Sequence, residues 1–331
     1  MITDNRKRTT ENDMIIEYDK LIENKTLIAI VGPTASGKTQ VSIELSKLLN
    51  IEVISADSRQ IYKYLDIGTA TPSESELNAV KTYFINELEP DECYSAGKFG
   101  DDAEQVALQI LNKGKIPVVV GGTGLYVQSL CEGFFDDEKD DLLRIGIKSK
   151  LDNLLKENGI DYLFNKLISV DRASAEKYSD KNPRRVLRAL EYYELSGMPF
   201  SEAQKKYRKI RNFDVHYFGI KYPRAELYER INKRAEIMWK NGLLDEVKNV
   251  LSMGFSADLN SLNTVGYKEA IAYHNGQMSE EEALEKMKQN TRRYAKRQMT
   301  WFRKNKKIQW LTGTEEEIAA KIFRKLVDLS N

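Results

Sequence analysis

The chain has 331 residues, of which 41% are hydrophobic and 31% charged, which excludes a disordered protein and leaves room for a substantial core. Lys and Arg number 51 against 50 Asp and Glu, so the net charge of +1 by itself predicts no partner, and only local clusters of charge can do so. The two cysteines, Cys93 and Cys131, have no CxxC spacing. Neither a zinc site nor a disulfide framework can be read from them, which favours a reducing compartment.

The first twenty residues are polar and lack the apolar core of a signal peptide. No uncharged apolar run approaches the roughly 20 residues that a membrane-spanning helix needs. We therefore expect a cytoplasmic protein without a membrane segment. Residues 1–24 are expected to form an N-terminal extension, either loose or helical.

Short apolar runs predict the strands of a parallel sheet. The expected strands are 26–31 (TLIAIV), 51–58 (IEVISADS), 116–126 (IPVVVGGTGLY), 215–222 (VHYFGIKY) and 307–313 (KIQWLTG). Helical periodicity is present at 40–50, 223–252 and 279–304. Strands that alternate with helices indicate a doubly wound α/β fold, here a core in two parts, 25–132 and 213–331.

The stretch between the two parts of the core has a different character. Clear strand runs disappear, and amphipathic helical segments follow one another at 141–157, 159–168, 171–178 and 183–196. We expect residues 133–212 to form a helical insertion domain.

A phosphate-binding loop follows the first expected strand. Its residues match G-x-x-x-x-G-K-[ST] and are Gly32, Pro33, Thr34, Ala35, Ser36, Gly37, Lys38 and Thr39. Backbone N–H groups of the loop, the helix N-terminus and the Lys38 ammonium can hold a polyphosphate, and the Thr39 hydroxyl can hold Mg²⁺. Loops of this kind are typical of nucleotide-binding proteins, but the loop does not identify the reaction.

The acid that a nucleotide hydrolase places after an apolar strand is missing from the best candidate strand. The run "IPVVV" ends in Gly121-Gly122. Asp57 is the acid at a strand end, followed by residues that could face an acceptor. It could act as a base toward an incoming nucleophile, cap a helix, or lie in the outer shell of Mg²⁺.

Further motifs along the chain can be read together with the phosphate loop. In chain order they are GPTASGKT, ISADSRQIY, DIGTATP, YSAGKF, GGTGLY, RRVLRALE, GLLDEV, TVGYKEA and TRRYAKRQMTWFR. From about residue 27 to 310, their order and spacing resemble those of tRNA dimethylallyltransferases of the bacterial type, the isopentenyl-diphosphate:tRNA transferase family. The resemblance implies transfer of a dimethylallyl group from dimethylallyl diphosphate to the exocyclic N6 of the adenosine on the 3′ side of the anticodon. The loop would then hold a diphosphate that leaves.

The same resemblance assigns roles to residues. Asp57 matches the family's base, Arg234 an arginine that contacts the diphosphate, and Thr123 a position at the catalytic channel. The family's tRNA contacts map onto Asp57, Ser58, Arg59 and Gln60 and onto the insertion arginines Arg184, Arg185 and Arg188.

Residues 291–307 form a basic helix by pattern. The segment has eight Lys and Arg and no acid. On a helix, Ala295, Met299 and Phe302 fall on one face, expected inward, while Arg293, Arg297, Thr300 and Lys304 share another. Such a face fits phosphates and unstacked bases, and with the resemblance it places Lys296, Arg297 and Arg303 on the tRNA anticodon stem-loop.

Three other functions remain open at this point. A P-loop kinase would need lid arginines and a Mg²⁺-binding acid, and would leave the basic helix unexplained. An adenylate prenyltransferase acting on AMP, ADP or ATP would have little use for the arginine-rich insertion. A non-catalytic RNA-binding protein is disfavoured by the intact Lys38, Thr39 and Asp57. The protein is expected to be a monomer with Mg²⁺ as cofactor.

Overall fold

A computed structural model of the chain describes residues 18–135 and 141–330. It divides into two compact units, one of Met1–Cys131 with Arg211–Asn331 and the other of Glu132–Ile210. Most of the expected N-terminal extension, residues 1–17, lies outside the described residues. Its last part forms helix α1 (Tyr18–Glu23), whose Leu21 is buried in the core of the first unit.

The first unit contains a six-stranded sheet within the described residues, and every pairing in it is parallel. The strands, in sheet order, are β3 (Thr82–Tyr83), β2 (Ile51–Ser55), β4 (Ile116–Gly121), β1 (Thr26–Val31), β5 (Asp214–Ile220) and β6 (Gln309–Leu311). The predicted α/β fold with a parallel sheet is confirmed. The short β3 was not predicted.

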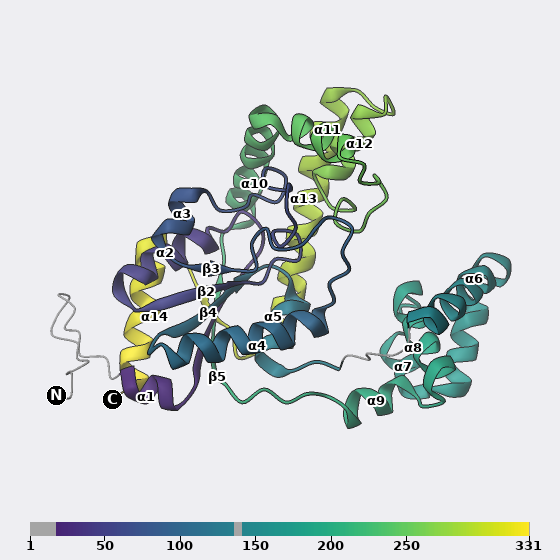
Figure 1. The fold of residues 1–331 in the computed structure, drawn as a ribbon, viewed down its shortest axis with the longest axis horizontal. Coiled ribbons are helices and arrows are strands. Elements are labelled where there is room, and N and C mark those ends of the chain that lie inside the picture. The colour runs from purple at the N-terminus through teal and green to yellow at the C-terminus, as the bar shows by residue number, and fades with distance from the viewer. Residues whose placement is uncertain (1–17, 136–140, 331) are drawn as a thin grey trace. The chain divides into compact units, whose positions relative to one another are not determined.

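Helices cover both faces of this sheet (Figure 1). On one face, α1, α2 (Lys38–Leu48) and α14 (Glu315–Ser330) pack on Ile28, Ile30 and Phe218. On the other, α4 (Ala96–Asn112) and α5 (Gly124–Glu132) pack on Leu27 and Ala29. Alternate residues of β1 therefore enter opposite cores, which explains why all of β1 is buried and why it is apolar after Thr26.

The remaining helices of this unit lie beyond the carboxyl ends of the strands or at the sheet edge (Figure 1). They are α3 (Glu74–Ala79), α10 (Arg224–Met238), α11 (Leu244–Ser252), α12 (Tyr267–His274) and α13 (Glu280–Phe302). A π-helical turn, η1 (Trp239–Leu243), separates α10 from α11, and Gly242 within it has φ 103°. The helical pattern over 223–252 thus belongs to two helices.

The second unit is helical in its described residues. Its helices are α6 (Asp141–Val170), α7 (Arg172–Lys177), α8 (Pro183–Ser196) and α9 (Phe200–Lys206). Gly159, with φ 74°, breaks α6 between the two segments that periodicity predicts, and Leu163, Val186 and Leu190 lie in a core of the unit's own. Helix α8 begins at Pro183, the predicted start, and the side chain of Asn182 caps it.

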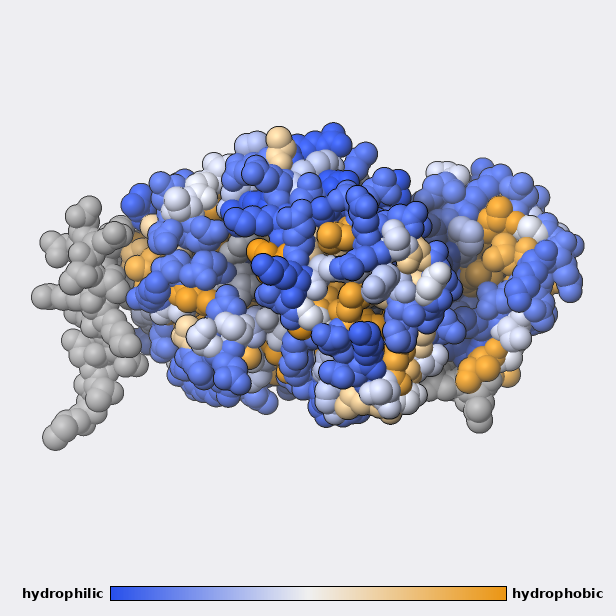
Figure 2. All heavy atoms as spheres, turned by 90° about the horizontal axis from the view of Figure 1, so that it is seen from above, coloured by the Kyte–Doolittle hydropathy of each residue, from blue (hydrophilic) through white to orange (hydrophobic). Residues whose placement is uncertain are grey.

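No helix among the described residues is long and apolar enough to cross a membrane. The face seen in Figure 2 is largely hydrophilic, with hydrophobic side chains in scattered patches.

Candidate active site

The phosphate loop connects β1 to α2 and curls around the N-terminus of that helix. Gly37 has φ 77°, a left-handed conformation that costs glycine nothing, and it directly precedes the first residue of α2. No side chain caps this helix end. Its N–H groups and the positive end of the helix dipole therefore remain available for an anion.

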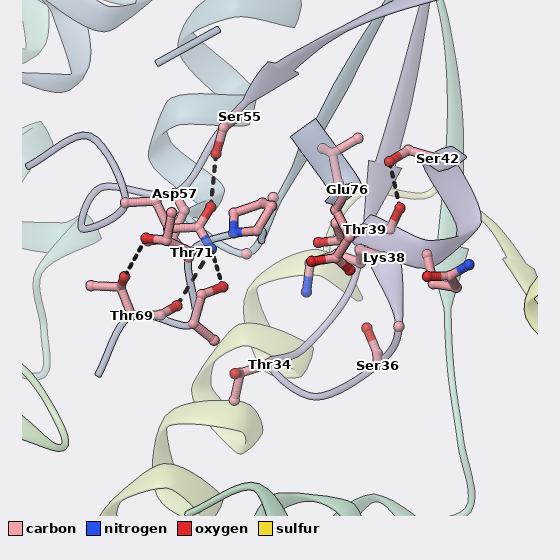
Figure 3. A pocket seen from close by; sticks show the side chains of 18 of the residues that line it. Thr34, Ser36, Lys38, Thr39, Ser42, Ser55, Asp57, Thr69, Thr71 and Glu76 are labelled. Carbon is pink, nitrogen blue, oxygen red and sulfur yellow. Dashed lines mark hydrogen bonds between the residues drawn. The ribbon is translucent and has the colours of Figure 1, made fainter. Parts of the chain in front are cut away.

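A cavity of about 350 Å³ opens over this loop. Residues 34–39 all line it, together with Asp57, Gln60 and Arg234. Gly32 and Pro33 are buried but do not line the cavity. In Figure 3 the side chains of Lys38 and Thr39 lie on one side of the cavity and Asp57 on the other.

Two cations and two carboxylates share the cavity. Burial, and then the charge of Arg234, lowers the pKa of Lys38 to about 8, although Asp57 acts in the opposite direction. Burial also lowers the pKa of Arg234, which Asp57 and Glu76 counteract. The cavity thus holds two desolvated cations beside two carboxylates, and the cations are suited to a polyphosphate.

Lys38 and the loop backbone are held by a few neighbours. The Lys38 ammonium donates to the Pro33 carbonyl at 2.7 Å. Arg230 of α10 donates to the carbonyl of Ala35, at 2.9 Å, and stacks on the Tyr222 ring. These bonds fix a loop in which Ala35 itself has φ 62°.

Asp57 follows the last residue of β2 by two positions. One of its carboxylate oxygens accepts the N–H of Arg59 at 2.9 Å, and the N–H of Ser58 donates to the Thr123 hydroxyl at 3.1 Å. No helix begins after Asp57, so the helix-cap alternative is excluded. Thr123 does not line the cavity; it ties the Asp57 turn to the end of β4.

Gln60 lines the cavity, but its amide is already engaged. It accepts a hydrogen bond from Ser55 at 3.1 Å and donates to the carbonyl of Ala70 at 3.0 Å. This pattern assigns Gln60 a role in holding the loop that contains Ala70, which the sequence did not reveal.

Helix α13 brings two further residues to the cavity that sequence reasoning missed. Gln298 accepts the N–H of Thr34 at 2.8 Å and donates to the Gly122 carbonyl at 3.0 Å, so it joins the phosphate loop to the end of β4. Burial raises the pKa of Tyr294 to about 12, and the negative charge of Asp57 acts in the same direction. A glutamine within a basic run carries no signal of being buried.

Gln298→Ala is expected to destabilise the protein by about 2–4 kcal/mol, because it leaves the buried Gly122 carbonyl and the half-buried Thr34 N–H without a partner. Gln289→Ala, an exposed glutamine on the same helix, is the matched control and should change stability by less than about 0.5 kcal/mol. Urea unfolding of both variants measures the difference. Equal stability losses would remove Gln298 from its structural role.

Of the other residues expected to contact tRNA, Ser58, Arg59 and Arg188 are half-buried and the rest are exposed. On α13 and directly after it, Arg293, Lys296, Arg297, Thr300, Arg303 and Lys304 are exposed, whereas Ala295 and Phe302 are buried. Met299, the third residue of the predicted inward face, is half-buried; the division of this helix into two faces is otherwise as predicted. Arg297 stacks on Tyr294, with 5.7 Å between the guanidinium carbon and the ring centre.

The insertion arginines lie on α8 of the second unit. Arg184 and Arg185 are exposed, and Arg185 is 3.8 Å from Asp180. Arg188 is partly buried and donates to Glu191 at 3.1 Å. The position of these arginines relative to the cavity depends on how the two units are arranged, which is not described.

Among the residues that the structure describes, no three His, Cys, Asp or Glu side chains gather into a metal site. Oxygen donors are nevertheless present in the cavity, namely the Thr39 hydroxyl and the carboxylates of Asp57 and Glu76. One hydroxyl with one or two carboxylates suits Mg²⁺, which takes its other ligands from substrate phosphates and water.

The fold and the site together define a P-loop α/β protein. Comparison with known proteins narrows this class. The family model described as IPP transferase matches residues 60–305, and the chain belongs to this family.

Relatives match over nearly the whole chain. The tRNA dimethylallyltransferase of Acetivibrio thermocellus is 44% identical over 303 residues, which are 91% of this chain and 96% of the relative. The solved structure of a tRNA delta(2)-isopentenylpyrophosphate transferase from Staphylococcus epidermidis covers 92% of this chain and 99% of its own, at 38% identity and a TM-score of 0.66. A eukaryotic dimethylallyltransferase acting on tRNA covers 87% of this chain and 73% of its own, at 28% identity and a TM-score of 0.70.

Proposed function

We propose that this protein transfers the dimethylallyl group of dimethylallyl diphosphate to the exocyclic N6 of the adenosine 3′-adjacent to the anticodon in tRNA, and releases diphosphate. The observation that carries the proposal is that Asp57 lines the same cavity as the phosphate loop and Arg234. A base and a cradle for a leaving diphosphate are what an alkyl transfer requires.

The chemistry follows from the reactants. The adenine amine is a weak nucleophile, because its lone pair is delocalised into the ring, whereas the allylic carbon tolerates developing positive charge. The nitrogen attacks this carbon, the bond from carbon to the diphosphate oxygen breaks, and the bond electrons leave with the diphosphate. The proton of the amine passes to the Asp57 carboxylate.

The residues singled out in and beside the cavity have separate tasks in this scheme. Backbone N–H groups of residues 35–39, Lys38 and Arg234 stabilise the charge that grows on the departing diphosphate. Asp57 accepts the proton and Thr123 holds the Asp57 turn. Mg²⁺, held by Thr39 with Asp57 or Glu76 beside it, would neutralise part of the diphosphate charge.

The exposed basic face of α13 supports the tRNA part of the proposal. An adenosine in an anticodon loop must leave its stack to reach a cavity, at a cost of a few kcal/mol that contacts to the backbone and to bases offset. Arg297 and Lys296 lie on the helix that also brings Tyr294 to the cavity. The arginines of α8 would bind the same stem-loop. The protein would act in the cytoplasm, as a monomer.

The test uses labelled dimethylallyl diphosphate with Mg²⁺ and two acceptors, unmodified tRNA with adenosines in the anticodon loop and free AMP. We expect label in the tRNA alone. Label in AMP would instead make the protein an adenylate prenyltransferase, and phosphate transfer without label in either acceptor would make it a kinase.

Arg297→Ala is expected to weaken tRNA binding and to reduce the slope of log affinity against log salt by about 1, with the donor KM unchanged. Lys286→Ala, an exposed lysine of α13 outside the 291–307 run, is the matched control and should keep the wild-type slope. Filter binding at several salt concentrations measures this slope. A large rise in donor KM would place Arg297 at the diphosphate instead.

A further inference from the structure

A clamp of hydrogen bonds holds one wall of the cavity. The wall is the loop of residues 66–72, of which Thr69, Ala70, Thr71 and Pro72 line the cavity. Glu246, in the first turn of α11, accepts three successive backbone N–H groups of this loop: Asp66 at 2.8 Å, Ile67 at 2.7 Å and Gly68 at 3.1 Å. A carboxylate held by three N–H groups is a strong, charge-assisted contact.

Tyr267, the first residue of α12, completes the clamp. Its hydroxyl donates to Glu246 at 2.6 Å, and its side chain is fully buried. Burial, together with the negative charge of Glu246, raises the pKa of this hydroxyl far above its ordinary value, so it remains a donor at every physiological pH.

The Tyr267 ring also lies directly against the loop backbone. A Cβ at Gly68 would come within 2.4 Å of the ring, so only glycine permits this approach. The clamp therefore combines a carboxylate, a phenol and a glycine from three places in the sequence.

Hydrogen bonds through Gln60 connect the clamped loop to the segment that contains Asp57. The carbonyls of Ala70, at 3.0 Å, and of Thr69, at 3.4 Å, accept the Gln60 amide. Gln60 in turn accepts the Ser55 hydroxyl, two residues before Asp57. Figure 3 shows Ser55, Asp57, Thr69 and Thr71 on the same side of the cavity.

The clamp acts on this side of the cavity alone. All four hydrogen bonds described for Glu246 go to residues 66–68 and to Tyr267, and none goes to residues 34–39 of the phosphate loop. We propose that Glu246, supported by Tyr267, is a positioning residue that sets the acceptor-side wall of the cavity and with it the Asp57 turn. The kinetic part of this inference rests on the proposed function.

Glu246→Gln is the main test. The substitution replaces one carboxylate oxygen by an NH₂ group, which cannot accept a hydrogen bond. At least one of the groups that donate to Glu246 therefore loses its acceptor. We expect kcat to fall about 10- to 100-fold, because displacing reacting groups by a fraction of an ångström to about 1 Å has an effect of this size. The donor KM should change less than threefold. Tyr267→Phe removes the hydroxyl that donates to Glu246 and should give a smaller fall of kcat in the same direction.

Glu269→Gln is the matched control. Glu269 is a buried carboxylate, whereas Glu246 is half-buried, and Glu269 accepts the Gly266 N–H and the Asn290 amide, each at 2.7 Å. This variant should lose comparable thermal stability but keep kcat within about twofold. A fall of kcat as large as that of Glu246→Gln, measured well below both melting temperatures, would overturn the positioning role.

Hydrogen exchange separates this inference from the proposed function. In the substrate-free protein, Glu246→Gln should speed exchange of the N–H groups of residues 66–68, and Glu269→Gln should not. If Glu246→Gln speeds this exchange but the wild-type protein transfers no dimethylallyl group, the proposed function is contradicted and the clamp is supported. Unchanged exchange at 66–68 would contradict the clamp itself.

Discussion

Asp57→Asn is expected to lower kcat for dimethylallyl transfer by about 10²- to 10⁴-fold while tRNA affinity changes less than threefold. The asparagine oxygen can still accept the Arg59 N–H, so the turn that presents residue 57 should persist. What the variant lacks is a carboxylate that takes the proton of the adenine amine. Single-turnover transfer to tRNA and binding of tRNA measure the two quantities separately.

Asp258→Asn provides the control for the loss of one negative charge, because Asp258 is exposed and outside the cavity. It should leave both kcat and tRNA affinity unchanged. If Asp57→Asn kept the wild-type kcat, Asp57 would have no part in proton transfer. If it lost tRNA affinity as severely as kcat, its role would be in binding the acceptor.

Donor affinity is expected to fall by up to tenfold per pH unit above pH 8. Burial and the neighbouring Arg234 lower the pKa of Lys38 to about 8, so the ammonium of the substrate-free protein loses its proton as the pH rises past this value. A bound diphosphate favours the charged lysine and raises its pKa again. Binding above pH 8 therefore requires uptake of a proton, and affinity drops as protons become scarce.

Titration with dimethylallyl diphosphate between pH 7 and pH 10 measures this dependence, since the last ionisation of a phosphate ester, near pH 6, is complete over that range. Lys38→Arg is the matched variant, because a guanidinium stays charged throughout. Its affinity should be almost independent of pH. A flat profile for the wild-type protein would mean that Lys38 keeps its charge in the substrate-free cavity.

Periodicity and turn chemistry predicted the parts of the fold whose signal is local. The run 26–31 became β1, and the start of α8 at residue 183 was predicted to the residue. Helix α14 was missed although its apolar positions, such as Ile318, Ile322 and Leu326, have helical spacing. The strand β3 has two residues and depends on its pairing with β2, so no local pattern could indicate it.

The residues of the candidate site also divide into those that a local pattern predicts and those that it does not. Residues 34–39 form a contiguous motif with its own physics, and they line the cavity as expected. Gln298, Glu246 and Tyr267 act through partners that lie far away in sequence, and each partner is a backbone group or a single side chain. Such contacts leave no spacing or periodicity in the sequence, and only the folded chain reveals them.

The most direct test of the account is to follow both products of one reaction with wild-type protein, Mg²⁺, unmodified tRNA and labelled dimethylallyl diphosphate. The account predicts label on the N6 of the adenosine next to the anticodon after nuclease digestion, with one diphosphate released for each label and no orthophosphate. Orthophosphate release, or label on any atom other than N6, would contradict the claim that the phosphate loop holds the leaving group of an alkyl transfer to adenosine.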